Sequence, residues 1–248
     1  SFPYVLNLGE DINEVLDYLN GVYSTIVLKD VVYRFKITDT KMLESVVRFV
    51  FDNVGNPLSS KRIADTMTLA GRKIDVKTVE KYITALQQSF IVYEAKRYDV
   101  KGKKYIQTPQ KYYFADIGLR NAKLNFRQIE ETHLMENIIY NELRVRGYQV
   151  DVGVVVKRDR TEEGVQEKKQ LEIDFVANMG SKRYYIQSAF SLPDAEKRAQ
   201  EKASLINVND SFKKIIIVKD VVKPLHDNDG ILTMSIYDFL LNEHSLEL

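Results

Sequence analysis

Apolar residues in the first half of the chain recur at helical spacing in three short segments. In residues 38–53 they fall at positions i, i+4 and i+8, and Thr38 or Asp39 is available as the helix N-cap. The same pattern predicts a short helix over residues 59–67 and a third over residues 76–89. Three short helices joined by tight turns indicate a helix-turn-helix architecture.

A predicted β-hairpin follows these helices. Residues 91–98 and 104–114 have the composition of strands, and residues 99–103 between them form a basic tip with a glycine at the bend. This hairpin would be the wing of a winged helix, in which the last helix enters the major groove of DNA. The residues expected to bind DNA are Lys73, Lys77, Thr78 and Lys81 on or beside the third helix, and Lys101, Lys103 and Lys104 at the tip.

Two other interpretations of this block stay open. Winged helices also dock proteins, and an exposed helix rich in lysine is often merely solvated. The block offers no set of Arg, Asn or Gln side chains arranged for base edges, so contact with phosphates is favoured over base recognition.

The second half of the chain alternates between helical and extended segments. A strong helix is predicted over residues 131–146 and ends at Gly147. After it, strands are predicted over 148–158, 171–178, 183–189, 214–218 and 231–235, helices over 193–206 and 236–242, and a polar turn over 161–170. The chain is therefore expected to be an α+β or α/β protein.

Two carboxylates stand out in the predicted strand 171–178. Glu172 and Asp174 alternate with apolar residues, so a strand places both carboxylates on one face and the apolar side chains on the other. Residues 178–181 supply a turn, and the next strand would pair back as a hairpin, which could bring Gln187 near Asp174. On spacing alone, the favoured alternative is the solvated outer face of an amphipathic strand.

Length, composition and charge narrow the class of protein. The chain has 248 residues, which favours two domains, and it has no cysteine, which excludes disulfides and thiolate zinc sites. Its apolar runs are too short to span a bilayer and no signal peptide is evident, so a cytoplasmic protein without a membrane partner is expected. From Lys61 to Phe114, 12 basic side chains face 5 acidic ones, and only this block has an electrostatic reason to meet nucleic acid.

The predicted order of helix and strands after residue 130 resembles the PD-(D/E)XK nuclease superfamily. In that superfamily a helix acid, a strand Asp and an (E/D)-x-K pair on the next strand converge on Mg²⁺. The resemblance implies catalytic positions at Glu136, Asp174 and Gln187, with Gln187 where an acid is usual and Ala189 where the lysine belongs. Glu136, Asp174 and Glu172 are the implied metal ligands, and Mg²⁺ is the cofactor that such oxygen ligands favour.

The two altered positions weaken the expected chemistry. A glutamine keeps a ligand oxygen but removes one negative charge, and an alanine cannot position a water or stabilise charge on a phosphate. The nuclease-like core is therefore expected to be catalytically degenerate, and this chain to be inactive as an enzyme on its own. His133, one helical turn before Glu136, is expected to be a surface or capping histidine.

The whole chain resembles something narrower, the region that follows the ATPase module in a family of prokaryotic AAA-type ATPases. The resemblance rests on Gly21–Asp30, Lys77–Tyr82, Lys111–Arg120, Glu136–Asn137, Glu172–Val176 and Tyr185–Gln187. It implies a helical connection to the ATPase over residues 1–36, a winged-helix domain over 37–118 and a restriction-endonuclease-like domain over 119–248. No GxxxxGK[ST] phosphate loop occurs in the sequence, and the start at Ser1 without a methionine is expected for an excised piece of a larger protein.

The function expected from these resemblances is that of a nucleic-acid-binding or regulatory C-terminal portion of an ATPase. Its expected partners are the ATPase domain of the same polypeptide and DNA. Two alternatives are a Mg²⁺-dependent DNA nuclease and a winged-helix transcriptional regulator.

Overall fold

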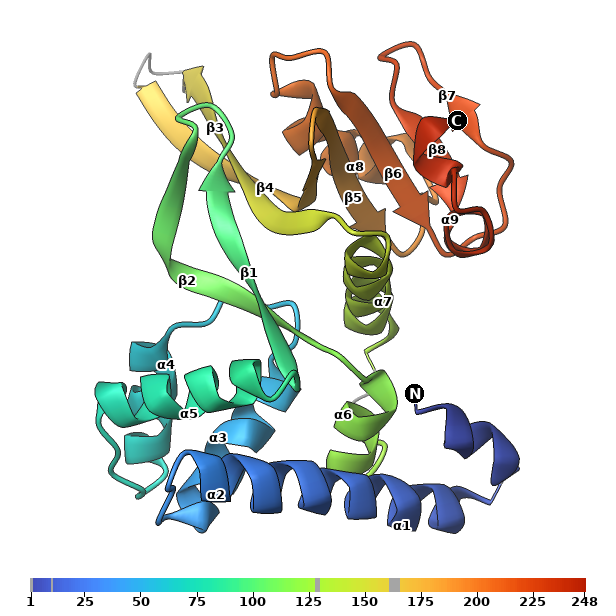
Figure 1. The fold of residues 1–248 in the computed structure, drawn as a ribbon. Helices are drawn as coiled ribbons and strands as arrows, with labels where there is room; N and C mark the ends of the chain where they lie inside the picture. The colour runs from blue at the N-terminus through green and yellow to red at the C-terminus, as the bar shows by residue number, and fades with distance from the viewer. Residues whose placement is uncertain (1, 10, 128–129, 161–165) are drawn as a thin grey trace. The chain divides into compact units, whose positions relative to one another are not determined.

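The protein folds into two compact units, whose helices and strands are labelled in Figure 1. The computed structural model describes residues 2–9, 11–127, 130–160 and 166–248. The first unit comprises Ser1–Glu94 and Thr108–Glu130, and the second comprises Ala95–Gln107 and Glu131–Leu248. The structure thus divides differently from the expected boundary between residues 118 and 119, because residues 119–130 belong to the first unit and Ala95–Gln107 to the second. Within the described residues, no helix is long and apolar enough to cross a membrane.

The first unit is mainly helical. Its elements are η1 (Pro3–Asn7), α1 (Ile12–Tyr23), the π-helix η2 (Ser24–Val31), α2 (Val32–Arg34), α3 (Thr40–Asp52), α4 (Ser60–Leu69), α5 (Val76–Gln88) and α6 (Ile117–Lys123). The helices α3, α4 and α5 confirm the three predicted from periodicity. Each begins at a side-chain cap, because Asp39, Ser59 and Asp75 accept hydrogen bonds from backbone N–H groups of the first turn.

A short β-bridge joins the segment between α3 and α4 to the strand β2 (Lys104–Phe114). The backbone N–H of Leu58 donates to the carbonyl oxygen of Gln110 at 2.7 Å, and the N–H of Gln110 donates back at 3.0 Å. Leu58 is buried, as are the inward residues Val79 and Leu86 of α5. In the first unit, α3, α4 and α5 therefore pack against one another and are joined to a segment of β2.

The strand β1 (Val92–Asp99) and β2 are joined by a tip that belongs to the second unit. Arg97–Asp99 of β1 pairs in parallel with Val152–Val154 of β3, and the N–H of Val100 donates to the carbonyl oxygen of Val154 at 3.0 Å. The Val100 side chain is buried in the apolar core of that unit. The basic tip of the hairpin expected to be the wing is therefore built into the sheet and core of the second unit.

The second unit contains the rest of an eight-stranded mixed sheet. Its elements are α7 (Glu131–Val145), β3 (Gln149–Arg160), β4 (Gln166–Met179), β5 (Lys182–Ala189), α8 (Ala195–Ile206), β6 (Lys213–Val218), β7 (Leu225–His226), β8 (Leu232–Ser235), α9 (Ile236–Leu241) and η3 (Ser245–Glu247). The strand order is β2-β1-β3-β4-β5-β6-β8-β7. The strands β3, β4 and β5 are antiparallel, whereas β5, β6 and β8 run parallel. The expectation of a mixed α/β protein is confirmed at this level.

The helices α7 and α8 cover opposite faces of this sheet. The ring of Tyr140 on α7 lies 6.3 Å from that of Phe175 on β4, between ring centroids. Val176, the next residue of β4, packs in the apolar cluster that contains Leu205 of α8. Successive side chains of a strand point to opposite faces, so the two helices lie on opposite sides.

A β-bulge interrupts β4 at the predicted carboxylate. Ile173 pairs with Gly153 and Val176 with Asp151, so two residues of β4, Asp174 and Phe175, face one residue of β3. Ile173 and Val176 therefore lie on the same face although three positions separate them, and both join the cluster beside α8.

Three segments differ from the sequence prediction. Residues 166–170, expected to lie in a turn, extend β4, while residues 161–165 of that turn lie outside the described chain. The helix α6 and the short strand β7 were not predicted. Residues 167–170 are exposed, and their strand is held by main-chain pairing with β3. Because main-chain pairing needs no apolar side chains, the sequence has no apolar pattern that would predict this strand.

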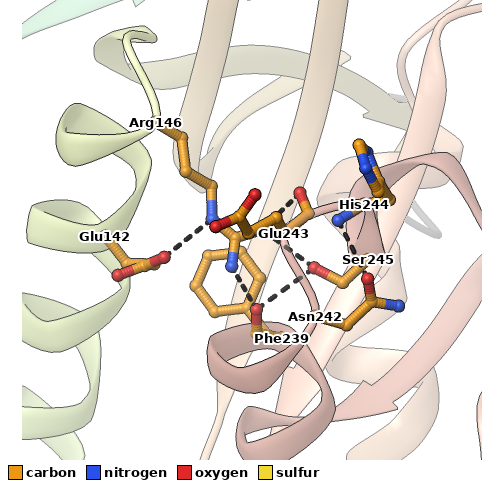
Figure 2. A network of polar contacts seen from close by, with 7 residues as sticks. All are labelled: Glu142, Arg146, Phe239, Asn242, Glu243, His244 and Ser245. Carbon is orange, nitrogen blue, oxygen red and sulfur yellow. Dashed lines mark hydrogen bonds and ion pairs between the residues drawn. The ribbon is translucent and has the colours of Figure 1, made fainter.

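The C-terminal segment is tied to α7 by the side chain of Arg146 (Figure 2). Its Nε donates to Glu142 at 2.8 Å, and its Nη1 donates to the Ser245 hydroxyl at 2.9 Å and to the Glu243 carbonyl oxygen at 3.3 Å. Its Nη2 donates to the carbonyl oxygen of Phe239, and the guanidinium carbon lies 4.5 Å from the centre of the Phe239 ring. One side chain thus satisfies backbone carbonyls where α9 ends.

Candidate functional site

Asp174 is a buried carboxylate that holds two strands together. Its side chain is 8% exposed, and Oδ2 accepts a hydrogen bond from the backbone N–H of Ser188 at 2.8 Å. Asp174 follows Ile173, whose side chain faces α8, so the carboxylate points to the opposite face, which α7 covers. Its geometry fits a structural hydrogen bond beside the bulge.

Glu136 lies on α7 and is also buried, at 7% exposure. It therefore occupies the same side of the sheet as Asp174, as the resemblance implies, while Glu172 is half-buried. Among the described residues, however, no three His, Asp or Glu side chains are grouped so that they could hold a metal ion. The predicted metal set of Glu136, Asp174 and Glu172 does not form such a group, and one oxygen of the Asp174 carboxylate accepts a backbone hydrogen bond from β5.

Gln187 points away from Asp174. Tyr185 and Ala189 belong to the cluster beside α8, and alternation along β5 directs Gln187 to that face. Its amide nitrogen lies 3.4 Å from Glu201 Oε2, and the Ser204 hydroxyl donates to its amide oxygen at 3.4 Å. The expected meeting of Gln187 with Asp174 is therefore wrong, since the two side chains leave the sheet on opposite faces.

The lysines predicted to contact DNA on and beside α5 are exposed. Lys73 precedes the helix, and Lys77 and Lys81 follow at a spacing of four residues along one face. No residue that the structure describes forms an ion pair with Lys73, Lys77 or Lys81. Glu80 is exposed on the same helix, so the face is cationic but not exclusively so.

Thr78 has a different role from the one predicted. Its backbone N–H donates to Asp75 Oδ1 at 2.9 Å, and its hydroxyl donates to Asp75 Oδ2 at 2.7 Å. These hydrogen bonds to Thr78 lower the pKa of Asp75 and cap the first turn of α5. The hydroxyl is thus used in the cap, where it stabilises the helix that carries the lysines.

The lysines of the hairpin tip lie on the second unit. Lys101, Lys103 and Lys104 are exposed, and Lys101 Nζ donates to the carbonyl oxygen of Val156 at 3.4 Å. A cavity of about 850 Å³ opens beside the tip and is lined in part by Lys101, Lys104 and Lys168. The seven predicted DNA contacts therefore divide between two units. The buried Val100, an apolar residue in an otherwise polar turn, was the sequence signal for this division.

A second cationic cavity, in the first unit, was not predicted. Its volume is about 730 Å³, and its lining combines basic side chains, hydroxyls and amides around one carboxylate. The lining residues are Asn20, Thr40, Lys41, Glu44, Ser45, Arg48, Arg72, Lys123 and Asn125. They come from four separate segments of the chain, so no local sequence pattern could show that they meet.

Comparison with known proteins identifies a family. An uncharacterized protein of Haemophilus influenzae is 33% identical over 240 residues, which are 97% of this chain and 55% of that protein. An uncharacterized protein of Methanocaldococcus jannaschii is 23% identical over 233 residues, 94% of this chain and 47% of that protein. The chain thus spans about half the length of these relatives, and no solved structure matches it.

The family match falls on the first unit. Residues 1–130 match the domain of unknown function DUF8612, and Glu130 is also where the first unit ends. Because these residues make up more than half of the 248-residue chain, the protein belongs to the DUF8612 family.

Proposed function

We propose that the first unit binds nucleic acid by placing the outer face of α5 against backbone phosphates. The observation that carries this proposal is the exposed row of Lys73, Lys77 and Lys81, none of which is neutralised by an ion pair among the described residues. Lysine ammonium groups that are not paired with carboxylates displace the counterions condensed on the phosphates of a nucleic acid, and the release of these counterions drives binding.

The order of elements in the first unit supports a winged-helix interpretation. The helices α3, α4 and α5 are followed by a β-hairpin, and the β-bridge between Leu58 and Gln110 joins that hairpin to the segment after α3. In DNA-binding modules of this order the third helix is the one that enters the groove. The base of β1 and β2 belongs to this unit, whereas the tip does not.

We propose that recognition rests on phosphates rather than on bases. The exposed positions of α5 include one amide suited to a base edge, that of Gln88, and no arginine; they are Val76, Lys77, Glu80, Lys81, Thr84 and Gln88. Binding should therefore be strong at low salt, weak at high salt and nearly independent of sequence.

For the second unit we propose a role in recognition or assembly rather than in cleavage. Its αβββαβ order resembles that of a nuclease, but Ala189 is buried in the apolar cluster and Gln187 is directed at α8. A carboxylate that bonds the Ser188 N–H at 2.8 Å serves the sheet in this arrangement.

We further propose that the chain acts beside an ATPase domain of the same polypeptide. The resemblance to the C-terminal region of AAA-type ATPases motivates this, and the two relatives are long enough to hold such a domain, because the match covers 55% and 47% of their lengths. Association of the isolated chain with the other half of a relative, measured by analytical ultracentrifugation, would test it.

The test of nucleic-acid binding uses the full chain and a short duplex labelled for fluorescence anisotropy. At about 50 mM salt we expect saturable binding, and the triple variant K73A/K77A/K81A should bind at least tenfold more weakly. Its plot of log K against log salt should be shallower by roughly 2.7, at about 0.9 per lost phosphate contact.

A matched control removes the same charge elsewhere. Lys29, Lys169 and Lys223 are exposed lysines outside α5, and their triple alanine variant should keep its affinity within twofold. Equal weakening of both variants would mean that net charge alone attracts DNA. That outcome, or a native chain that does not bind at low salt, would reject the proposed role of α5.

A further inference from the structure

The cationic cavity of the first unit has features that the proposed nucleic-acid face does not use. Its volume of about 730 Å³ falls within the range of small-molecule sites. The basic side chains that line it are Lys41 and Arg48 on α3, Arg72 before α5 and Lys123 at the end of α6. All of them belong to the first unit, so the cavity is formed within one compact body.

The single carboxylate in the lining is already compensated. Glu44 Oε2 lies 2.7 Å from Lys123 Nζ, and Glu44 Oε1 accepts a hydrogen bond from the Tyr23 hydroxyl at 3.0 Å. Burial and the nearby Glu44 charge raise the pKa of Tyr23, so this hydroxyl stays protonated and remains a donor. Glu44 and Lys123 therefore cancel, and the other basic residues set the charge of the cavity.

Three other cations, Lys41, Arg48 and Arg72, line the cavity, and none has a carboxylate at ion-pair distance among the described residues. Asp39, the N-cap of α3, accepts a hydrogen bond from the N–H of Met42 at 2.8 Å and does not line the cavity. The lining side chains thus carry four positive charges and one negative charge, and Asp52, which does not line the cavity, offsets part of the Arg48 charge.

The guanidinium of Arg72 is fixed in place before any ligand arrives. Its Nη1 donates to the carbonyl oxygen of Lys41 at 3.2 Å and also to the Ser45 hydroxyl. Its Nε and Nη2 form no hydrogen bond with the part of the chain that the structure describes. An arginine held in this way presents the rest of its planar fork, which suits bidentate binding of a phosphate.

We infer that this cavity binds a small molecule that carries two or more phosphate groups. Three cations spread around a concave site match several linked phosphates better than one, and Thr40 and Asn20 add a hydroxyl and an amide donor. No exposed aromatic ring lines the cavity on which a base could stack, so the phosphate chain is the part recognised. The inference is independent of the nucleic-acid face on α5.

Calorimetric titration of the full chain with inorganic tripolyphosphate and with orthophosphate tests this inference. We expect one saturable site, with tripolyphosphate bound at least tenfold more tightly than orthophosphate. The variant K41A/R48A should weaken tripolyphosphate binding at least tenfold, and it leaves the main-chain bond between Arg72 and the Lys41 carbonyl in place. The control variant K29A/K61A, which removes two exposed cations of the same unit, should stay within twofold.

The same titrations separate this inference from the proposed function. The α5 variant K73A/K77A/K81A should bind tripolyphosphate normally even if it no longer binds DNA. Absence of a saturable site, or equal weakening in the control pair, would overturn the inference. It would also be overturned if tripolyphosphate failed to bind while K41A/R48A lost duplex DNA, because the cavity would then be part of the nucleic-acid surface.

Discussion

Arg146 is expected to be the main attachment of the C-terminal segment, and its replacement tests that role. The side chain is 9% exposed and makes four polar contacts, to Glu142, Phe239, Glu243 and Ser245 (Figure 2). Arg146→Ala removes all of them and also the packing of the guanidinium on the Phe239 ring. The Glu243 carbonyl oxygen then loses the donor that Arg146 supplies, and the Phe239 carbonyl oxygen keeps only the Ser245 hydroxyl, at 3.2 Å.

The size of the effect follows from these contacts. A hydrogen bond to a charged group contributes about 1.5 to 3 kcal/mol. The pair with Glu142 contributes less, roughly 0.5 kcal/mol, because that carboxylate is 26% exposed and partly screened. Since the freed carbonyls can regain water, we expect Arg146→Ala to cost about 3 kcal/mol. Arg146→Lys should cost about half as much, because an ammonium keeps the positive charge but lacks the planar fork that reaches several acceptors.

Urea unfolding followed by far-UV circular dichroism measures this loss, since the chain contains no Trp. Arg198→Ala, which removes an exposed arginine from α8, should change stability by less than about 0.5 kcal/mol. Hydrogen exchange should accelerate first in residues 236–247. A loss below about 1 kcal/mol, or faster exchange confined to the first unit, would refute the assigned role of Arg146.

Two further predictions concern buried carboxylates of the second unit. Asp174→Ala should lower its stability by about 1 to 3 kcal/mol in urea unfolding, because the Ser188 N–H loses its acceptor; an unchanged midpoint would exclude this structural role. Burial raises the pKa of Asp151, although the hydrogen bond from Tyr105 acts in the opposite direction. The folded state therefore disfavours the ionised carboxylate, and stability is lost as the pH rises from the ordinary pKa of 3.8 through the raised pKa. Asp151→Asn should therefore stabilise the protein at neutral pH but not below the ordinary value, and equal effects at both pH values would contradict the shift.

The sequence predicted local structure well where periodicity and caps agree. The three helices of the first unit, with caps at Asp39, Ser59 and Asp75, lie close to where apolar spacing placed them. The hairpin of β4 and β5 was also predicted, because alternation and a turn sequence are local signals. The strand at residues 166–170 was missed, since main-chain pairing alone holds it.

The candidate sites depended on contacts between distant residues. The sequence pattern placed Glu172 and Asp174 on one face of a strand and allowed Gln187 to lie near Asp174, while Glu136 came from the resemblance alone. In the structure β4 has an extra residue at Asp174, and the alternation of β5 directs Gln187 to the other face. Register and bulges are set by packing over the whole sheet, so a one-residue shift is not visible in a local pattern.

By itself, the sequence determined the helices and strands, the mixed α/β class and the cationic face of α5, because each depends on the spacing of residue types along the chain. Only the tertiary structure decided that Val100 anchors the hairpin tip in the second unit and that Lys41, Arg48 and Arg72 meet around one cavity. The physical reason is that burial and charge clustering depend on which distant segments pack together, and that choice is made by the complete core.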